Sequence, residues 1–290
     1  MTERTIIGLA SWLDTPAGHY LREWEQAQLD HAVADIFGFH ALQLGLGAID
    51  GLRANRMPHR WLALDGTATA PASGRIAAAD APGPDSDTAS DGPPLGTPAF
   101  DTTPTPLAVR CDFDALPFAT RSLDLIVLPH ALEFARDPHR ALAEVDRVLR
   151  PEGRLVIAGF NPASLWGLRQ RAGRLRRRLR PGGARQLFLP GEGDLIGWRR
   201  LRDWLRLLSF EVEASRFGGY GWPLNRDGWI RRDNWIERAG DRWWSPFGAL
   251  YVLVAVKRVR GMRLVGMVKS ARAAPATAPA VVVRRSEDPR

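Results

Sequence analysis

The chain has 290 residues, of which 45% are hydrophobic and 25% are charged, as in an ordinary globular protein with one large domain or two small ones. The formal net charge of +8 is compatible with polyanions or acidic surfaces as partners. The single cysteine, Cys111, excludes an internal disulfide and a cysteine-based zinc site, and it fits a reducing compartment. Residues 1–20 lack the pattern of a signal peptide, and the longest apolar run, Phe247–Val256, is about half as long as a membrane-spanning helix. We therefore expect a cytoplasmic protein with no bound metal.

The N-terminal part of the chain predicts one helix followed by two short strands. Large apolar side chains recur at roughly helical spacing over residues 18–39. Phe39–Leu46 and Arg60–Leu64 are short apolar runs of the kind that form buried strands. The first run leads into the sequence Gly-Leu-Gly, and the second ends at Asp65.

Residues 67–106 differ in kind from the rest of the chain. They are almost entirely Ala, Pro, Gly, Asp, Ser and Thr, with hardly a large apolar side chain. Such a segment cannot bury enough apolar surface to offset the entropy that it would lose on ordering. We expect a disordered insertion here.

The segment after the insertion predicts a parallel β-α-β unit. Strands are expected at residues 107–110, 123–128 and 154–160, where short apolar runs occur. Between the last two, Asp137 and Pro138 supply a helix N-cap and a proline at the first helical position, and residues 150–153 end the helix. Strand, helix and strand of these lengths are typical of a doubly wound α/β sheet.

The C-terminal half continues with a basic segment, two further strands and a tail. Residues 169–185 hold eight arginines and no acidic residue. An amphipathic helix is expected at residues 201–208, and strands at 210–215 and 250–256. Residues 261–290 are expected to form a flexible tail.

The most informative stretch runs from Cys111 to Gly153. It reads Cys-Asp-Phe-Asp-Ala-Leu-Pro-Phe, then Ser-Leu-Asp-Leu-Ile-Val-Leu-Pro-His, then a helix that ends in Arg-Pro-Glu-Gly. Its order and spacing resemble the signature D-x-x-x-LPF … FD-x-V … E-x-x-RVL-x-PGG of S-adenosylmethionine (SAM)-dependent methyltransferases of the type 11 group. The residues in register with the end of that signature are Glu144, Arg147, Val148, Leu149, Pro151 and Gly153. The resemblance covers roughly residues 38–165 and the closing strands, and it implies the class I fold: a Rossmann-like, doubly wound sheet of seven mostly parallel strands.

Two glycines and an aspartate are candidate cofactor ligands. In an open α/β sheet, ligands bind outside the carboxyl ends of the strands, where the strand order reverses. Gly45 and Gly47 are expected at such an end, and because glycine has no Cβ, the backbone there can approach a ligand closely. Asp65 ends the next strand, where a carboxylate can accept hydrogen bonds from ribose hydroxyls.

The resemblance adds three further cofactor contacts. It implies that Asp112 meets the adenine amino group, that the backbone of Phe113 meets the adenine ring nitrogens, and that Leu128 lines the cofactor site. A dinucleotide is disfavoured because Asp50 stands at the third position of G-x-G-x-x-G, where a carboxylate repels pyrophosphate. SAM has no phosphate, and its sulfonium cation tolerates acidic neighbours.

The chain departs from the signature in two places. The usual D-x-GCG-x-G has become the stretch from Gln43 to Ile49, so the methionine end of SAM is expected to be crowded or differently held. The helix that normally joins the second and third strands is replaced by the insertion at 67–106. These departures leave open a domain that keeps the fold and has lost catalysis.

His130 and Glu133 are the candidate catalytic residues. They follow the fourth strand and are expected to point toward the substrate. If the acceptor is an acidic hydroxyl or an amine, His130 can take its proton, although a lone histidine at a strand end is more often structural. Methyl transfer depends more on in-line positioning than on proton transfer, and His19 and Tyr20 are candidates for a lid over the site.

The arginine run at 169–185 admits three interpretations. It can be a solvated face, which is the default for a charge run. It can bind the phosphates of RNA or of a carrier-bound substrate, or it can lie on an anionic membrane surface, for which Leu168, Leu175 and Leu179 supply a thin apolar stripe. Seven of the eleven tryptophans lie in residues 198–244, which suits stacking on nucleobases but favours packing in a core.

The sequence therefore predicts a chain of five segments. They are a cap helix at 1–37, a SAM-binding core at 38–165, a basic cap segment at 166–208, closing strands with a Trp-rich insertion at 209–260, and the tail at 261–290. The leading hypothesis is a SAM-dependent methyltransferase with a small-molecule acceptor. The alternative is a catalytically degenerate methyltransferase-like module that binds RNA or a membrane surface, and an oxidoreductase is disfavoured by Asp50.

Overall fold

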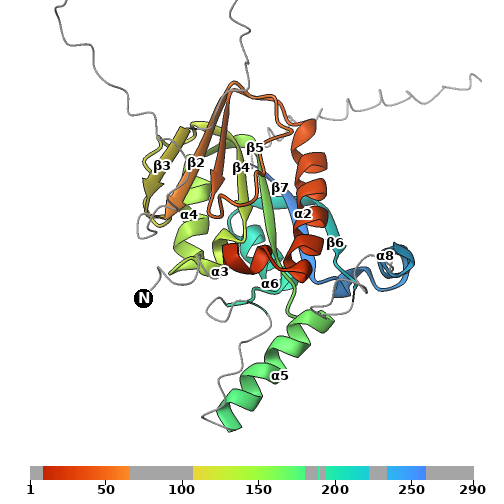
Figure 1. Ribbon diagram of the computed structural model, residues 1–290. Helices are drawn as coiled ribbons and strands as arrows, with labels where there is room; N and C mark the ends of the chain where they lie inside the picture. Colours follow the sequence, from red (N-terminus) through yellow and green to blue (C-terminus); the bar gives the residue numbers. More distant parts are fainter. Residues whose placement is uncertain (1–8, 66–106, 180–188, 190–193, 222–233, 259–290) are drawn as a thin grey trace, which may run out of the picture. The chain divides into compact units, whose positions relative to one another are not determined.

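The computed structural model describes residues 9–65, 107–179, 189, 194–221 and 234–258 (Figure 1). The expected insertion at 67–106, the expected tail at 261–290, and Arg180 and Arg185 of the arginine run lie outside these ranges. Across the described ranges no helix is long and apolar enough to cross a membrane.

A seven-stranded sheet organises the described chain. In spatial order its strands are β3 (Leu107–Cys111), β2 (His59–Asp65), β1 (His40–Leu44), β4 (Leu123–Pro129), β5 (Leu149–Phe160), β7 (Leu250–Lys257) and β6 (Phe210–Gly218). Neighbours from β3 to β5 pair in parallel, and β7 runs antiparallel to both β5 and β6. The expectation of a doubly wound, mostly parallel sheet is confirmed. The strand order reverses between β1 and β4, which is where such a sheet binds ligands.

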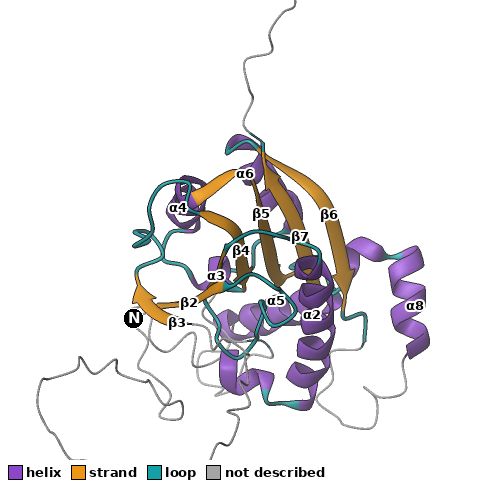
Figure 2. Cartoon of the chain, turned by 90° about the horizontal axis from the view of Figure 1, so that it is seen from above, coloured by secondary structure: helices purple, strands orange, loops and turns teal. Residues whose placement is uncertain are grey.

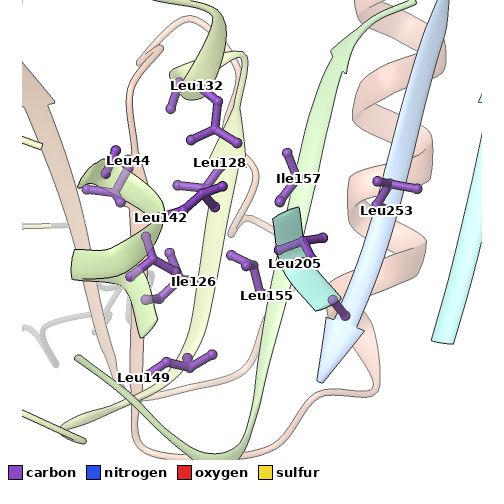
Figure 3. Packing of buried hydrophobic residues seen from close by; sticks show 14 of the residues in the cluster. Leu44, Ile126, Leu128, Leu132, Leu142, Leu149, Leu155, Ile157, Leu205 and Leu253 are labelled. Carbon is purple, nitrogen blue, oxygen red and sulfur yellow. The ribbon is translucent and has the colours of Figure 1, made fainter. Parts of the chain in front are cut away.

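Helices cover both faces of the sheet. The helices of the described ranges are α2 (Pro16–Ala34), α3 (Ala131–Phe134), α4 (Pro138–Val148), α5 (Leu165–Leu179), α6 (Trp198–Leu207) and α8 (Asn234–Trp243), followed by the short 3-10 helix η1 (Ser245–Phe247). Successive strand residues point to opposite faces, so Leu42 and Ile126 pack in one core cluster with α4 and α6, part of which Figure 3 shows. Ala41 and Leu125 pack in another cluster with α2. Figure 2 shows α4 and α6 on one side of the sheet and α2 on the other.

Helix α2 begins with a strong cap and ends earlier than its periodicity predicts. The Thr15 hydroxyl accepts a hydrogen bond from the Gly18 backbone N–H at 3.1 Å, and a proline opens the first turn. The helix ends at Ala34, although the apolar pattern continues to residue 39. The Asn55 amide donates to the carbonyl oxygens of Val33 and Ile36, at 2.9 and 3.0 Å, and so satisfies backbone acceptors at the point where the helix stops.

Helix α4 follows the sequence prediction at its start and differs at its end. The Asp137 carboxylate accepts from the backbone N–H groups of His139 and Arg140, as expected of an N-cap. The segment 150–153, predicted as a helix stop, is instead the first part of β5, which begins at Leu149. Leu149 pairs with Leu123 of β4, and the register then shifts at an irregularity. This cross-strand pairing is a long-range contact that the local helix-stop pattern does not reveal.

Candidate active site

The carboxyl ends of neighbouring parallel strands bring the candidate cofactor residues to one edge of the sheet. Asp65, the last residue of β2, is in register with Cys111, the last residue of β3, and Asp112 follows directly. On the other side of β2, the Gly45 backbone N–H donates to the Ala63 carbonyl oxygen at 3.0 Å. This edge therefore presents a glycine turn and two carboxylates beside the point where the strand order reverses.

The two candidate glycines differ in what the fold requires of them. Gly45 has a φ of +105°, a conformation that L-residues rarely adopt, and a Cβ there would lie 3.0 Å from the Ala131 Cβ. Gly47 is exposed, and a Cβ there would meet the Leu62 Cδ2 at 3.6 Å, which is ordinary van der Waals contact. The fold needs a glycine at position 45, but the packing alone does not explain the glycine at position 47.

Gln43 holds the loop that follows β1. Its buried amide donates to the carbonyl oxygens of Leu46 and Ile49, at 2.9 and 2.6 Å, and its carbonyl oxygen accepts from the Gly51 N–H at 2.8 Å. A carboxylate only accepts hydrogen bonds, so an aspartate could not make the same three contacts. Ile49 is fully buried in the core cluster that contains α2. Its side chain is therefore directed into the core, which removes the reason to expect that it crowds a cofactor.

The two carboxylates and the thiol between them share one electrostatic environment. Asp65 is half-buried and Asp112 is exposed, and the Asp112 carboxylate accepts from the Asp114 N–H at 3.1 Å in a short turn. Burial of the Cys111 thiol, with the negative charges of Asp112 and Asp65, raises the pKa of Cys111 to about 11. The thiol is therefore neutral at pH 7, and both carboxylates act on it as negative charges. Two such charges suit a cationic ligand better than a pyrophosphate.

Two predicted cofactor residues have buried side chains. Phe113 and Leu128 belong to the core cluster that contains α4 and α6, and Figure 3 shows Leu128 among the leucines of that cluster. A contact between either residue and a cofactor would therefore come from the backbone. For Phe113 this agrees with the role expected from the resemblance, and both roles stay predictions.

The signature residues Glu144 and Arg147 form a clamp on the loop between β3 and β4. The Arg147 guanidinium donates twice to the Glu144 carboxylate, at 2.9 and 2.8 Å, and also to the carbonyl oxygens of Leu116 and Phe118, both at 2.9 Å. Glu144 in turn accepts from the Leu116 N–H at 3.0 Å. The hydrogen bonds from Arg147 and the Leu116 backbone lower the pKa of Glu144. The clamp fixes the loop that carries Asp112, a function that the signature pattern by itself does not reveal.

His130 lies at the end of β4 and is enclosed by two carboxylates. Its Nδ1 is 2.8 Å from the Glu133 carboxylate and its Nε2 is 3.1 Å from that of Glu25, which is 105 residues away in the sequence. The His130 side chain is only 1% exposed. Burial opposes the charged form, but Glu25 and Glu133 outweigh burial and raise the pKa of His130 to about 10. The imidazole is therefore protonated at pH 7, with both ring nitrogens engaged.

The carboxylate of Glu133 extends this buried cluster to the neighbouring strands. It accepts from the Phe160 backbone N–H at the end of β5, and burial raises the pKa of Glu133. The Glu133 backbone carbonyl accepts from the Asp194 N–H at 3.2 Å, and burial and Glu133 together raise the pKa of Tyr251 in β7. We call Glu25, His130 and Glu133 the buried polar cluster. Its hydrogen bonds join α2, α3 and the ends of β4 and β5.

Sequence reasoning brought His130 and Glu133 together but missed Glu25. The available signal was its position between Leu21 and Leu29, at four-residue spacing on the apolar face of a predicted helix. A charged residue in such a stripe needs a buried partner. The proton-accepting role of His130 stays a prediction, and the protonated, enclosed state of the imidazole weighs against that role in this conformation. The Asp124 carboxylate of β4 accepts from the backbone N–H groups of Phe39 and His40 and so fixes the start of β1.

The sequence matches a family model described as a methyltransferase domain over residues 95–157, which contain the stretch from Cys111 to Gly153. It is also 31% identical over 269 residues to the uncharacterized protein YafS of Escherichia coli K12, which covers 92% of this chain and 88% of that protein. The chain belongs to the same family as YafS. Its residues 95–157 carry a SAM-dependent methyltransferase domain, for which the cofactor is SAM.

Other relatives match this methyltransferase over less of its length or at lower identity. A malonyl-[acyl-carrier protein] O-methyltransferase of Methylovorus sp. MP688 is 39% identical over 62 residues, 21% of either chain. A solved structure is described as the complex between the Haloferax volcanii Trm112 methyltransferase activator and the putative methyltransferase. It superposes with a TM-score of 0.50 and 19% identity, over 89% of this chain and 99% of that one. At this identity the likeness shows the fold alone.

Proposed function

We propose that this methyltransferase binds SAM along the carboxyl edge of β1, β2 and β3 and transfers its methyl group to a small-molecule acceptor. One observation carries the proposal: Gly45, Asp65 and Asp112, from three separate parts of the sequence, meet on that edge beside the reversal of strand order. No observation favours the alternative of a degenerate module.

The residues present fit the cofactor in charge and in shape. When bound, SAM would supply a methyl group on a sulfonium, and the neutral thioether of S-adenosylhomocysteine would be the leaving group. The Gly45 turn and the exposed Gly47 let the backbone approach the methionine end, and Asp65 accepts hydrogen bonds from the ribose hydroxyls. Asp112 and the Phe113 backbone hold the adenine, on the loop that Glu144 and Arg147 clamp. The acidic edge tolerates the sulfonium cation and disfavours a phosphate-bearing cofactor.

The acceptor in this proposal is a small molecule, in keeping with the name of the related malonyl-[acyl-carrier protein] O-methyltransferase. His130 and Glu133 serve as positioning residues in this proposal. They hold α2 and the end of β5 at the side of the carboxyl edge where an acceptor approaches, since in-line alignment supplies most of the acceleration of such a transfer. We also propose a cytoplasmic location, supported by the single, half-buried Cys111.

Calorimetric titration of the full-length chain with SAM, and with S-adenosylhomocysteine, tests the cofactor site. The variant Asp65→Asn keeps the side-chain shape but removes the charge, so SAM affinity is expected to fall about tenfold to a hundredfold. Asp203→Asn is the matched control, because Asp203 is an exposed aspartate on α6. Equal SAM affinity in the wild type and in Asp65→Asn would overturn the placement of the ribose at β2.

A further inference from the structure

Helix α5 is fixed to the protein through one narrow face. The Trp166 indole N–H donates to the Gly221 carbonyl oxygen at 2.7 Å, and its ring stacks on that of Tyr20. The Gln170 amide binds both backbone groups of Leu189, donating to the carbonyl and accepting from the N–H, each at 3.0 Å. Trp166 and Gln170 are buried and one turn apart, so they lie on the same side of the helix.

The opposite side of α5 carries an exposed row of leucines. Its members are Leu165, Leu168, Leu175 and Leu179, which are 51%, 60%, 57% and 72% exposed. With about 3.6 residues per turn, these positions and the exposed Ala172 fall within one stripe, turned by roughly half a rotation from Trp166 and Gln170. We call this row the leucine stripe. Because the anchoring face is already packed against the protein, the stripe faces away from it, and Figure 1 shows α5 extending from the sheet.

Basic side chains border the leucine stripe on both sides. The same helical geometry places Arg169 and Arg176 along one border and Arg171 along the other, and all three side chains are exposed. The sequence of α5 contains six arginines and no acidic residue. A helix with an apolar stripe between cationic borders is the pattern of segments that lie in the surface of an anionic membrane.

We propose that α5 docks on an anionic lipid surface, with the leucine stripe inserted among the acyl chains and the bordering arginines on the lipid phosphates. The exposed leucines distinguish this partner from RNA. Phosphate contacts on RNA need only the arginines, and nucleobase stacking needs aromatic side chains, whereas exposed leucines gain stability only by leaving water. This proposal is independent of where SAM binds.

Vesicle co-sedimentation of the full-length protein tests the proposal. The vesicles are phosphatidylcholine alone, or an equal mixture of phosphatidylcholine and phosphatidylglycerol, each measured across a salt series. We expect binding to the anionic vesicles at low salt, weakening as salt rises, and little binding to phosphatidylcholine alone. Combining Leu168→Ser, Leu175→Ser and Leu179→Ser should weaken anionic-vesicle binding by at least about tenfold.

Matched variants on α6 show whether a change in vesicle binding comes specifically from α5 or from the loss of any exposed leucine or arginine. Leu207→Ser replaces a leucine that is 84% exposed, and it should leave vesicle binding unchanged. Arg171→Gln with Arg176→Gln should weaken vesicle binding, whereas Arg199→Gln with Arg206→Gln removes the same charge from α6 and should have a smaller effect. An unchanged thermal midpoint in each variant shows that folding is intact.

Two results would overturn the proposal. One is the absence of binding to anionic vesicles at low salt. The other is a triple leucine variant that binds these vesicles as tightly as the wild type. If tRNA is retained and the leucine variant still binds it, with no vesicle binding, the helix is an RNA-binding element and the membrane proposal is wrong.

Discussion

Gln43 stands where the methyltransferase signature has an aspartate, and its amide suits the loop that follows. The loop from Leu46 to Gly51 contains turns instead of a helix, so its backbone groups need partners from elsewhere. Gln43 provides two donors and one acceptor to that backbone from a buried position. The substitution in the signature is therefore explained by the local architecture and is not in itself a sign of lost activity.

Alanine substitutions at the two glycines should affect different properties: SAM affinity at position 47 and the stability of the fold at position 45. Gly47→Ala should leave the free energy of unfolding within about 0.5 kcal/mol of the wild type, because its Cβ would meet only ordinary contacts. It should weaken SAM binding about tenfold if the cofactor passes over this backbone. Gly45→Ala should destabilise the fold by about 1–3 kcal/mol, because its φ is +105°. Denaturant unfolding and calorimetry measure the two quantities, and normal SAM affinity in Gly47→Ala would move the cofactor away from this loop.

The buried polar cluster should make stability depend on pH. The pKa of His130 is about 10 in the folded protein and 6.5 in its ordinary state. The stabilisation that it contributes is therefore complete below about pH 6.5 and is lost as the pH rises through about 10. We expect the free energy of unfolding to fall over that window in the wild type, and to fall much less in His130→Gln.

Replacing the protonated imidazole of His130 should also lower the free energy of unfolding at neutral pH. His130→Gln leaves Glu25 and Glu133 buried together, and we expect a loss of about 3–5 kcal/mol in the free energy of unfolding. Adding Glu25→Gln removes one of the two negative charges and should recover part of that loss. The control is His19→Gln, which changes an exposed histidine on the same helix as Glu25. An unaltered pH profile in His130→Gln would show that the imidazole is not the titrating group.

At the scale of elements, the signature residues connect α4 to the loop after β3. Glu144 and Arg147 lie one turn apart on α4 and contact a loop about thirty residues earlier in the sequence. Their hydrogen bonds to that loop fix the position of Asp112 relative to α4. Their spacing in the sequence was recognisable, but its structural purpose was not. The pattern of the family thus encodes a contact that supports the proposed adenine site.

Replacing Arg147 by lysine should weaken this connection. A single ammonium cannot reproduce the bidentate contact with Glu144 together with two carbonyl contacts. We expect Arg147→Lys to lower the free energy of unfolding by about 1–3 kcal/mol and to weaken SAM binding through the displaced loop. Arg150→Lys is the control, since Arg150 forms one half-exposed ion pair with Asp124 and should cost about 1 kcal/mol or less. If the two lysine variants unfold alike, the clamp does not stabilise the loop.

At the scale of the whole molecule, the connection from β2 to β3 spans a short distance although it contains many residues. Asp65 is in register with Cys111 and Trp61 with Leu107, so the crossover must return along four residues of strand. At about 3.3 Å per residue this span is roughly 13 Å, which a short linker can bridge. The intervening residues 66–106 have the composition of a segment without a core of its own.

Replacing residues 70–104 by an eight-residue Gly/Ser linker should therefore be tolerated. The entropic cost of closing a loop grows only logarithmically with the number of residues in it. The thermal midpoint should therefore stay within a few degrees of the wild type. A scanning calorimetry profile of the shortened chain measures this shift. Loss of cooperative unfolding would show that the segment contributes to the folded core, and unchanged SAM affinity would separate it from the cofactor site.

The sequence alone determined the sheet and the edge on which the cofactor is proposed to bind. Strand runs, the Asp137 cap and the signature from Cys111 to Gly153 are contiguous patterns, and they depend on periodicity and capping within a few residues of each other. Such patterns identified the doubly wound fold and the family. They also placed Gly45 and Asp65 at strand ends, because the ends of apolar runs are visible locally.

The tertiary structure decided which polar side chains are buried and which apolar ones remain exposed. His130 has its partner Glu25 on α2, and that pairing exists only because α2 packs on the sheet far from its place in the sequence. The leucine stripe of α5 is likewise exposed because Trp166 and Gln170 occupy the opposite face. Burial and exposure result from the docking of distant elements, so no local pattern could fix the charge of His130 or the surface that α5 offers.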